Sequence, residues 1–298
     1  MKFFSQPNVD FLGKKKLFFG ASAILLIVSM GVIAAHKGPV LGIDFTGGTF
    51  LQIGFKEIPP IEDIRNSLAK AGWTGFTLQT QPASHSIIIR LKQGERSKED
   101  VAGTLVSIFQ EDFPGNVEPI PERVEFVGPV IGKKLILDAL KAIFGSLLVM
   151  IVYIAFRFKK WVWGFAAVVA LAHDVFITIG FLTLINTEIT LVVIAALLTL
   201  AGYSINDTIV IFDRVRENFR MARKESPKET FNRSLNETLA RTINTSLTTL
   251  LASMTLLVLG GEVIHDFALT LTFGVLIGTY SSIGVAIALV HQFQYGDK

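Results

Sequence analysis

The stretch GYSINDTIVIFDR, residues 202–214, places a carboxylate inside sequence that otherwise suits a lipid bilayer. The residues from Ile189 to Asn206 carry no formal charge, so a helix running through them takes Asp207 below the lipid surface, six residues or about 9 Å inside Asp213. A charged side chain at the centre of a membrane helix costs about 2.5–3.5 kcal/mol on insertion scales. This cost favours a functional role for Asp207, although structural hydrogen bonds from a neighbouring helix would also compensate for it.

The composition of the whole chain is that of a membrane protein. Half of the 298 residues are hydrophobic, 18% are charged and the mean hydropathy is +0.51, whereas about a quarter of the residues of a soluble protein are charged. The net charge of +3 is small and does not indicate nucleic-acid binding. The sequence contains no cysteine, which excludes disulfides, a thiolate nucleophile and a cysteine-based metal site.

Six apolar segments are each long enough to cross a hydrocarbon core of about 30 Å. They are Leu17–Ala35, Leu135–Phe156, Trp161–Thr187, Ile189–Phe212, Thr242–Gly260 and Phe267–Val290. The first is a charge-free run of 19 residues, longer than the roughly 7–15 of a signal-peptide core, and is interpreted as a retained helix. The predicted fold is therefore an α-helical polytopic membrane protein with six transmembrane helices, the last five within residues 133–298.

Lysine and arginine in the short loops predict the orientation. One side of a six-span topology carries Lys14 to Lys16, then Arg157, Lys159 and Lys160, and then a connecting segment, 213–241, with eight basic and five acidic residues. This segment is interpreted as an amphipathic helix with a break at Pro227. By the positive-inside rule this side is cytoplasmic, and it includes residues 1–16 and the C-terminus. Lys133 and Lys134 oppose the bias but are outnumbered. Trp161 and Trp163 stand where interfacial aromatic residues are expected.

Residues 36–132 form a polar insert that this topology places outside the cytoplasm. Alternating polar and apolar residues predict strands at 48–55, 85–91 and 116–127 and, more weakly, at 76–80. Helical spacing predicts helices at 61–71 and at 98–113, and Ser97 is the expected N-cap of the second helix. The order βαββαβ is that of a ferredoxin-like α+β domain. The insert contains no P-loop, metal-ligand cluster or nucleophile with a base, so it is interpreted as a binding or mechanical module and the protein as a non-enzyme.

Two further sets of polar residues lie in the apolar segments. Asp174 follows His173 in the third segment, about 16 Å beyond Trp163 and near the middle of the bilayer, and the two side chains are expected to face different neighbours. For His173 a packing hydrogen bond is an equally good interpretation. Arg241 opens the fifth segment and either reaches to the cytoplasmic surface or points inward; it heads a polar stripe that continues through Asn244, Thr245, Thr248 and Thr249.

The motifs GIDFTGGT (42–49), after the first helix, and GYSINDTIVIFDRVREN (202–218), at the end of the fourth, resemble the SecF family of bacterial protein-export subunits, part of the resistance-nodulation-division superfamily. The resemblance covers essentially the whole chain. It implies an accessory subunit of the Sec translocase, driven by the proton-motive force, that promotes late steps of export across the bacterial inner membrane. It also implies SecD, SecYEG, YajC, YidC, membrane lipid and the translocating polypeptide as partners, with protons as coupling ion and no cofactor.

The resemblance also implies roles for individual residues. Asp207 takes up and releases protons, and Arg241 is a functional arginine that either favours the ionised form of Asp207 or serves an acid of the partner subunit. Intramembrane position adds Asp174 as a second proton-transfer residue, and supporting roles are considered for Asn206, His173 and Asp213, the last of which is more simply a solvated helix end.

The glycine-rich motif is assigned a structural role. Its residues Gly42, Asp44, Gly47 and Gly48 suit a turn that enters a strand, and they are expected to couple the first helix to the outer domain.

Two other interpretations remain open. A superfamily transporter for lipid or small molecules would share the intramembrane acid, but both six-helix halves are then expected in one chain. A passive membrane scaffold would keep its activity when Asp207 is neutralised.

Overall fold

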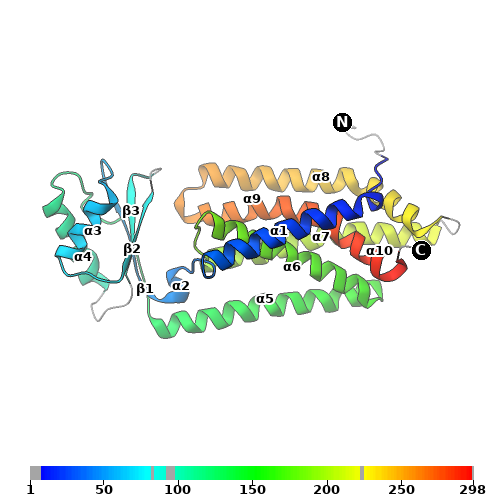
Figure 1. Cartoon of the computed structure of the whole chain (residues 1–298), viewed down its shortest axis with the longest axis horizontal. Coiled ribbons are helices and arrows are strands. Elements are labelled where there is room, and N and C mark those ends of the chain that lie inside the picture. Colours follow the sequence, from blue (N-terminus) through cyan, green and yellow to red (C-terminus); the bar gives the residue numbers. More distant parts are fainter. Residues whose placement is uncertain (1–7, 82–83, 92–97, 222–224, 297–298) are drawn as a thin grey trace. The chain divides into compact units, whose positions relative to one another are not determined.

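A computed structural model describes residues 8–81, 84–91, 98–221 and 225–296 and divides the chain into two compact units (Figure 1). One unit comprises Met1–Val40 and Leu140–Lys298, and the other comprises Leu41–Ala139. The first unit is helical and the second contains the sheet. Each is described by itself.

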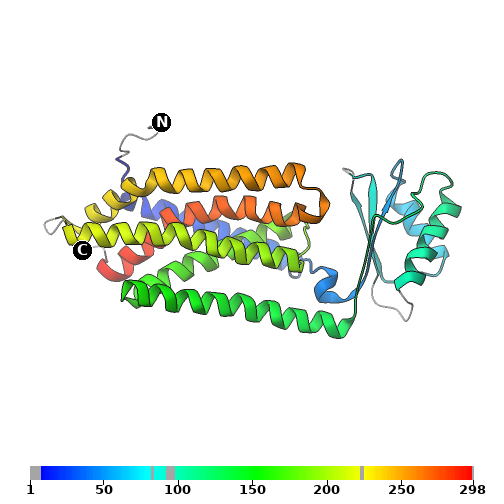
Figure 2. The same cartoon turned by 180° about the vertical axis from the view of Figure 1, so that it is seen from behind.

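The helical unit consists of long helices that run alongside one another, with both ends of the chain at the same end of the bundle (Figures 1 and 2). A short turn η1 (Leu12–Lys14) leads into α1 (Lys15–Ala35), and the remaining helices are α5 (Pro129–Phe158), α6 (Trp161–Leu184), α7 (Leu191–Met221), α8 (Pro227–Leu259), α9 (Glu262–Ser281), η3 (Ser282–Ala286) and α10 (Ile287–Tyr295). The segment η3 is a π-helical turn between α9 and α10. The described residues contain six helices that are long and apolar enough to cross a membrane, which confirms the predicted fold class.

The segment 213–241 is helical on both sides of the predicted break at Pro227, since α7 continues to Met221 and α8 begins at Pro227. Ser226 caps α8: its Oγ accepts a hydrogen bond from the Glu229 backbone N–H, and its own N–H donates to the Glu229 carboxylate. This reciprocal capping, with proline at the first helical position, stabilises a helix start outside the apolar segment.

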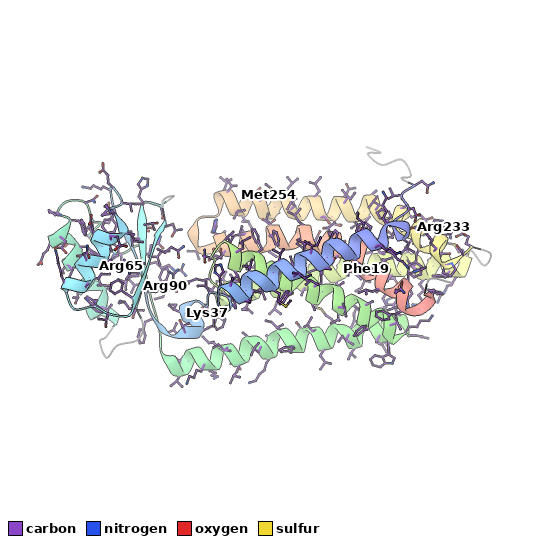
Figure 3. The ribbon with its side chains drawn as sticks, viewed as in Figure 1. Phe19, Lys37, Arg65, Arg90, Arg233 and Met254 are labelled. Carbon is purple, nitrogen blue, oxygen red and sulfur yellow. The ribbon has the colours of Figure 1, made fainter. Side chains whose placement is uncertain are left out.

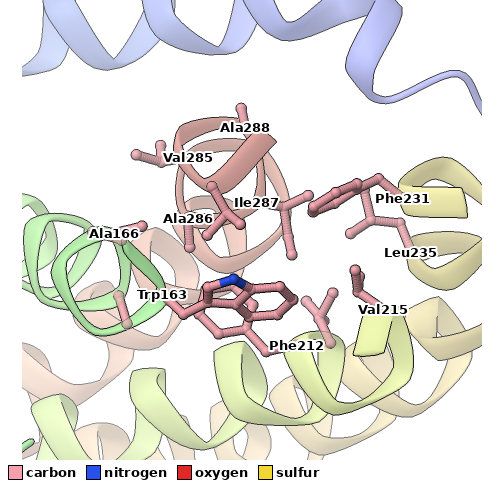
Figure 4. Packing of buried hydrophobic residues seen from close by; sticks show 14 of the residues in the cluster. Trp163, Ala166, Phe212, Val215, Phe231, Leu235, Val285, Ala286, Ile287 and Ala288 are labelled. Carbon is pink, nitrogen blue, oxygen red and sulfur yellow. The ribbon is translucent and has the colours of Figure 1, made fainter. Parts of the chain in front are cut away.

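The extensions of α7 and α8 beyond their apolar segments are held by a buried cluster of apolar side chains (Figure 4). Phe231 and Leu235 on α8 are buried in the same cluster as Phe212 and Val215 on α7. Trp163 lies in this cluster as well and therefore does not face lipid as the predicted interfacial residue would: it is 5% exposed, and its ring centroid lies 4.9 Å from that of Phe212.

The second unit contains an antiparallel sheet in the order β2-β3-β1-β4. Its elements are α2 (Ile43–Thr46), β1 (Gly48–Gly54), α3 (Ile61–Lys70), β2 (Phe76–Gln81), β3 (Ser86–Leu91), α4 (Lys98–Asp112) and β4 (Arg123–Val127). Alternate residues of the central strands, Leu51, Ile53, Ile87 and Ile89, are buried in one core with residues of α3 and α4. The order of elements and the strand order confirm the ferredoxin-like prediction.

The last strand is shorter than the predicted 116–127. It spans Arg123–Val127, and Val117 contributes only an isolated bridge to Phe55. Pro119 and Pro121 lie between the two and cannot donate backbone hydrogen bonds to a sheet, which explains the gap. The predicted N-cap Ser97 lies outside the described residues.

Backbone conformation explains why two positions of the glycine-rich motif are glycine. Gly47 follows the single turn α2 with φ of 69°, and Gly48 begins β1 with φ of 128°. Both values lie in the region that side chains disfavour. Gly42 precedes α2, and Asp44 lies half-buried in its first turn.

Candidate functional site

Asp174 joins three helices through its carboxylate. The side chain lies on α6 and is fully buried. Its Oδ2 accepts hydrogen bonds from Ser204 on α7 and from Ser281 on α9, both 2.7 Å long. Its Oδ1 lies 2.9 Å from Nδ1 of His173. Short bonds to both oxygens compensate for the burial of the carboxylate.

His173 contacts Asp174 directly, which corrects the expectation that the two side chains face different neighbours. Its Nε2 is buried and has no hydrogen-bond partner among the described residues. The imidazole lies 6.3 Å from the ring of Tyr280, whose hydroxyl donates to the Phe18 carbonyl on α1.

Asp207 is also buried, at 3% exposure, but it is held more loosely than Asp174. Its Oδ1 accepts from Thr245 at 3.2 Å and its Oδ2 from Ser246 at 3.4 Å, both on α8. The single hydroxyl proton of Thr245 has two other acceptors, the backbone carbonyls of Arg241 and Thr242, at 3.1 and 2.9 Å. Within the described part of the chain, the carboxylate of Asp207 therefore has only long or shared hydrogen bonds.

Hydroxyl groups line the space around the two carboxylates. Ser246, which donates to Asp207, lies 2.7 Å from the Thr279 hydroxyl on α9. On α7, Thr208 follows Asp207 directly, and its hydroxyl lies 2.9 Å from that of Ser282, the first residue of η3. Ser282 in turn donates to the Ser204 carbonyl at 3.2 Å. These side chains of α6, α7, α8, α9 and η3 form two hydrogen-bonded groups, one that includes Asp174 and one that includes Asp207. Together we call them the hydroxyl seam: His173, Asp174, Ser204, Asp207, Thr208, Thr245, Ser246, Thr279, Ser281 and Ser282.

Small residues of α9 bring the helices close enough for these bonds. A Cβ added at Gly278 would lie 3.1 Å from the Ser204 Cβ and 3.6 Å from the Asp174 Oδ2, and one added at Gly274 would lie 2.4 Å from a methyl of Leu200. The GxxxG step from Gly274 to Gly278 therefore makes a close contact between α9 and α7. Larger residues here would separate α9 from α7.

The structure does not gather every predicted residue in the seam. Asn206 is exposed on α7, and Asp213 forms an ion pair with Arg157 at 2.9 Å at the end of the bundle. Arg241 is exposed on α8, one turn before Thr245, and no ion pair within 4.0 Å joins it to Asp207 in the part of the chain that the structure describes. The sequence analysis did not identify the hydroxyl donors of α9, Thr279 and Ser281, as site residues. The described residues hold no group of three or more potential metal ligands.

Comparison with known proteins identifies the family. Residues 112–295 match the family described as protein export membrane protein SecD/SecF, C-terminal, and residues 32–57 match the SecD/SecF GG motif. The chain is 40% identical over 294 residues to the protein translocase subunit SecF of Endomicrobium trichonymphae, covering 99% of this chain and 94% of that protein. The chain belongs to the SecF family.

Other relatives support the same assignment. The protein translocase subunit SecF of Escherichia coli O157:H7 is 42% identical over 284 residues, covering 94% of this chain and 86% of the relative. The crystal structure of SecDF, a translocon-associated membrane protein from Thermus thermophilus, is 38% identical with a TM-score of 0.87 over 97% of this chain. A SecDF structure in a super-membrane-facing form gives a TM-score of 0.71. The chain spans only 39% of each SecDF chain.

Proposed function

We propose that the chain is a subunit of the Sec translocase that couples proton movement through its hydroxyl seam to the late steps of polypeptide export. The observation that carries the proposal is Asp207, buried within a membrane-length helix and held only by long or shared hydrogen bonds. Ionisable residues inside membrane bundles commonly belong to proton relays. A carboxylate with weak bonds loses little when it changes its protonation state, so Asp207 is the proposed exchange residue.

The exposed polar side chains of α8 favour a partner subunit that completes the bundle. Arg241, Asn244 and Thr248 are exposed on this helix, while Met254 further along it is exposed and apolar (Figure 3). Polar side chains that faced hydrocarbon would be costly, so the stripe fits the surface of a second helical subunit. The chain spans 39% of each solved SecDF chain, which makes SecD the proposed partner, with SecYEG, YajC and YidC as further members of the assembly. Purification of a fully active monomer in mild detergent would contradict the SecD proposal.

The same basic residues that predict topology lie at one end of the helical unit. Lys14 to Lys16, Arg157 and Lys160 are at the end of the bundle that carries both termini (Figure 1). We infer a multi-pass protein of the bacterial inner membrane with both termini in the cytoplasm. A single cysteine introduced at Ser84 should react with an impermeant maleimide from outside the cytoplasm, and reaction only from the cytoplasmic side would refute this topology.

The proposal is tested by Asp207→Asn, which keeps the shape of the side chain but cannot ionise. Inverted membrane vesicles carrying the variant beside SecD are expected to lose the stimulation of polypeptide export by the proton gradient. Assembly with SecD should persist, because the amide can still accept from Thr245 or Ser246. Arg241→Lys is expected to be impaired as well, since lysine lacks the planar fork of arginine.

Asp213→Asn is the matched control, because it removes the same charge from the same helix at an exposed ion pair. It should retain gradient-dependent export. If the assembled Asp207→Asn complex responded to the gradient as the wild type does, the proton role would be rejected and a passive scaffold would be favoured.

A further inference from the structure

A small pocket opens at the end of the bundle that carries both termini, where the turn between α5 and α6 meets the ends of α7 and α10. Its volume is about 200 Å³. Three of its lining residues, Lys160, Arg216 and Arg220, are basic, and the described residues that line it include no acidic side chain. The pocket does not include Asp207: its residues Arg216 and Arg220 lie nine and thirteen residues further along α7.

Stacked aromatic rings form the walls of this basic pocket and give it a fixed shape. The rings of Phe158 and Trp163 stack at 5.3 Å with an interplanar angle of 14°, and those of Phe219 and Tyr295 stack at 5.5 Å with the same angle. The Trp163 indole N–H donates to the Gln294 side chain at 2.8 Å. Four aromatic residues from α5, α6, α7 and α10 are thus held in place before any ligand arrives.

The positive charge of the basic pocket is not neutralised by the nearest acids of α7. Asp213 forms its ion pair with Arg157, and Glu217 forms its ion pair with Arg214 at 2.7 Å. Arg216 donates through one terminal nitrogen to the Arg157 carbonyl at 3.2 Å, which positions its guanidinium group and leaves further N–H groups for an anion.

The position of the basic pocket along the bundle is that of lipid headgroups. Helix α6 has 24 residues and so is about 36 Å long, slightly more than a hydrocarbon core of about 30 Å. Lys160 directly precedes this helix, and Trp161 at its start is 72% exposed, as an aromatic residue at the membrane surface would be. The basic side chains therefore lie beside the phosphate layer.

We propose that the basic pocket binds the phosphate of an anionic glycerophospholipid headgroup. Arginine recognises phosphate through several N–H groups of one plane, and lysine adds a point charge. A volume of about 200 Å³ is below the roughly 300–1,000 Å³ of pockets for drug-sized ligands, which suits a headgroup and is small for a nucleotide. The bound lipid would join the cytoplasmic ends of α5, α6 and α7 independently of proton transfer.

The test is native mass spectrometry of the purified full chain titrated with phosphatidylglycerol or phosphatidylcholine. The variant Lys160→Gln/Arg220→Gln removes two exposed charges from the pocket. The control Lys14→Gln/Lys16→Gln removes two exposed charges from the same end of the bundle, outside the pocket. We expect the pocket variant to bind phosphatidylglycerol about thirtyfold more weakly, which corresponds to about 2 kcal/mol, or about 1 kcal/mol for each basic residue.

The control should bind phosphatidylglycerol as the wild type does, and phosphatidylcholine should bind weakly to all three proteins. Equal phosphatidylglycerol binding by the wild type and the pocket variant would overturn the proposal. Competition on the wild-type protein requires no variant to fold: glycerol phosphate at millimolar concentration should leave bound phosphatidylglycerol in place. Complete displacement would identify a site for soluble phosphates and would overturn the lipid assignment.

Discussion

Replacing Asp174 with alanine tests whether its carboxylate holds three helices together. The substitution removes the acceptor of the hydrogen bonds from Ser204 on α7 and Ser281 on α9. After the substitution, the Ser281 hydroxyl can still donate to the Gly278 carbonyl at 3.3 Å. The Ser204 hydroxyl has no second acceptor among the described residues. We therefore expect the helical unit to unfold at lower denaturant concentration.

The size of the effect follows from the two interhelical bonds to Asp174. Hydrogen bonds between membrane helices contribute about 0.6 kcal/mol on average and at most about 1.7 kcal/mol, which gives about 1.2–3.4 kcal/mol for two. Leaving the buried Ser204 hydroxyl unsatisfied costs about 1–3 kcal/mol, which favours the upper part of that range. The expected loss in the free energy of unfolding for Asp174→Ala is about 2–3 kcal/mol.

Unfolding in mixed micelles of increasing dodecyl sulfate content, followed by circular dichroism, measures this loss. Asp213→Ala is the control, because its exposed ion pair with Arg157 should contribute only about 0–1 kcal/mol. Asp174→Asn should lose less stability than Asp174→Ala, since the amide oxygen still accepts one hydrogen bond. If Asp174→Ala were no less stable than Asp213→Ala, the carboxylate would not be the junction that its geometry indicates.

Two further predictions concern the packing of α1 and the segment that precedes it. A Cβ added at Gly180 on α6 would lie 2.3 Å from the Ser29 Cβ on α1 and 2.8 Å from the Ser29 Cα. Gly180→Ala should therefore destabilise the helical unit by about 1–3 kcal/mol in the same unfolding assay, whereas Gly145→Ala, with open space around it, should not. The Gly13 backbone N–H donates to Asp10 and holds the pKa of that carboxyl below its ordinary value. The resulting stabilisation is complete above the pKa of the unfolded chain and is lost as the pH falls through the lower pKa of the folded protein. Hydrogen exchange of residues 9–13 should accelerate below about pH 4 in the wild type, and Asp10→Asn should abolish this pH dependence.

The six helices could be predicted from the sequence, but their ends could not. Long apolar runs identify membrane spans without any knowledge of packing. Beyond the runs, α7 and α8 continue because Phe231 and Leu235 are buried in one cluster with Phe212 and because Ser226 caps α8. These are tertiary and local contacts that hydropathy does not describe. The same packing buries Trp163, whose position in the sequence suggested an interfacial residue.

The carboxylates of the candidate site could be predicted, whereas most of its hydroxyl groups could not. A charge such as Asp174 or Asp207 stands out in an apolar segment because of its cost. Serine and threonine are common in membrane helices, and their role depends on how each helix is rotated. The rotation of α9 toward Ser204 is fixed by the close approach at Gly278, which is visible only in the folded bundle.

The contrast between the two buried carboxylates suggests how the bundle divides structural and functional tasks. Bonds of 2.7 Å from two helices would have to lengthen or rearrange if Asp174 were displaced, so this residue resists movement. Asp207 has bonds of 3.2 and 3.4 Å, both to α8, so a small shift of that one helix changes its surroundings. The hydroxyl of Ser282 contacts the Thr208 hydroxyl and the Ser204 carbonyl from the π-helical turn η3, a feature frequent at functional sites. In the proposed proton cycle, a firm junction beside a loosely held acid would let α8 respond to the protonation of Asp207 while α6, α7 and α9 keep their arrangement.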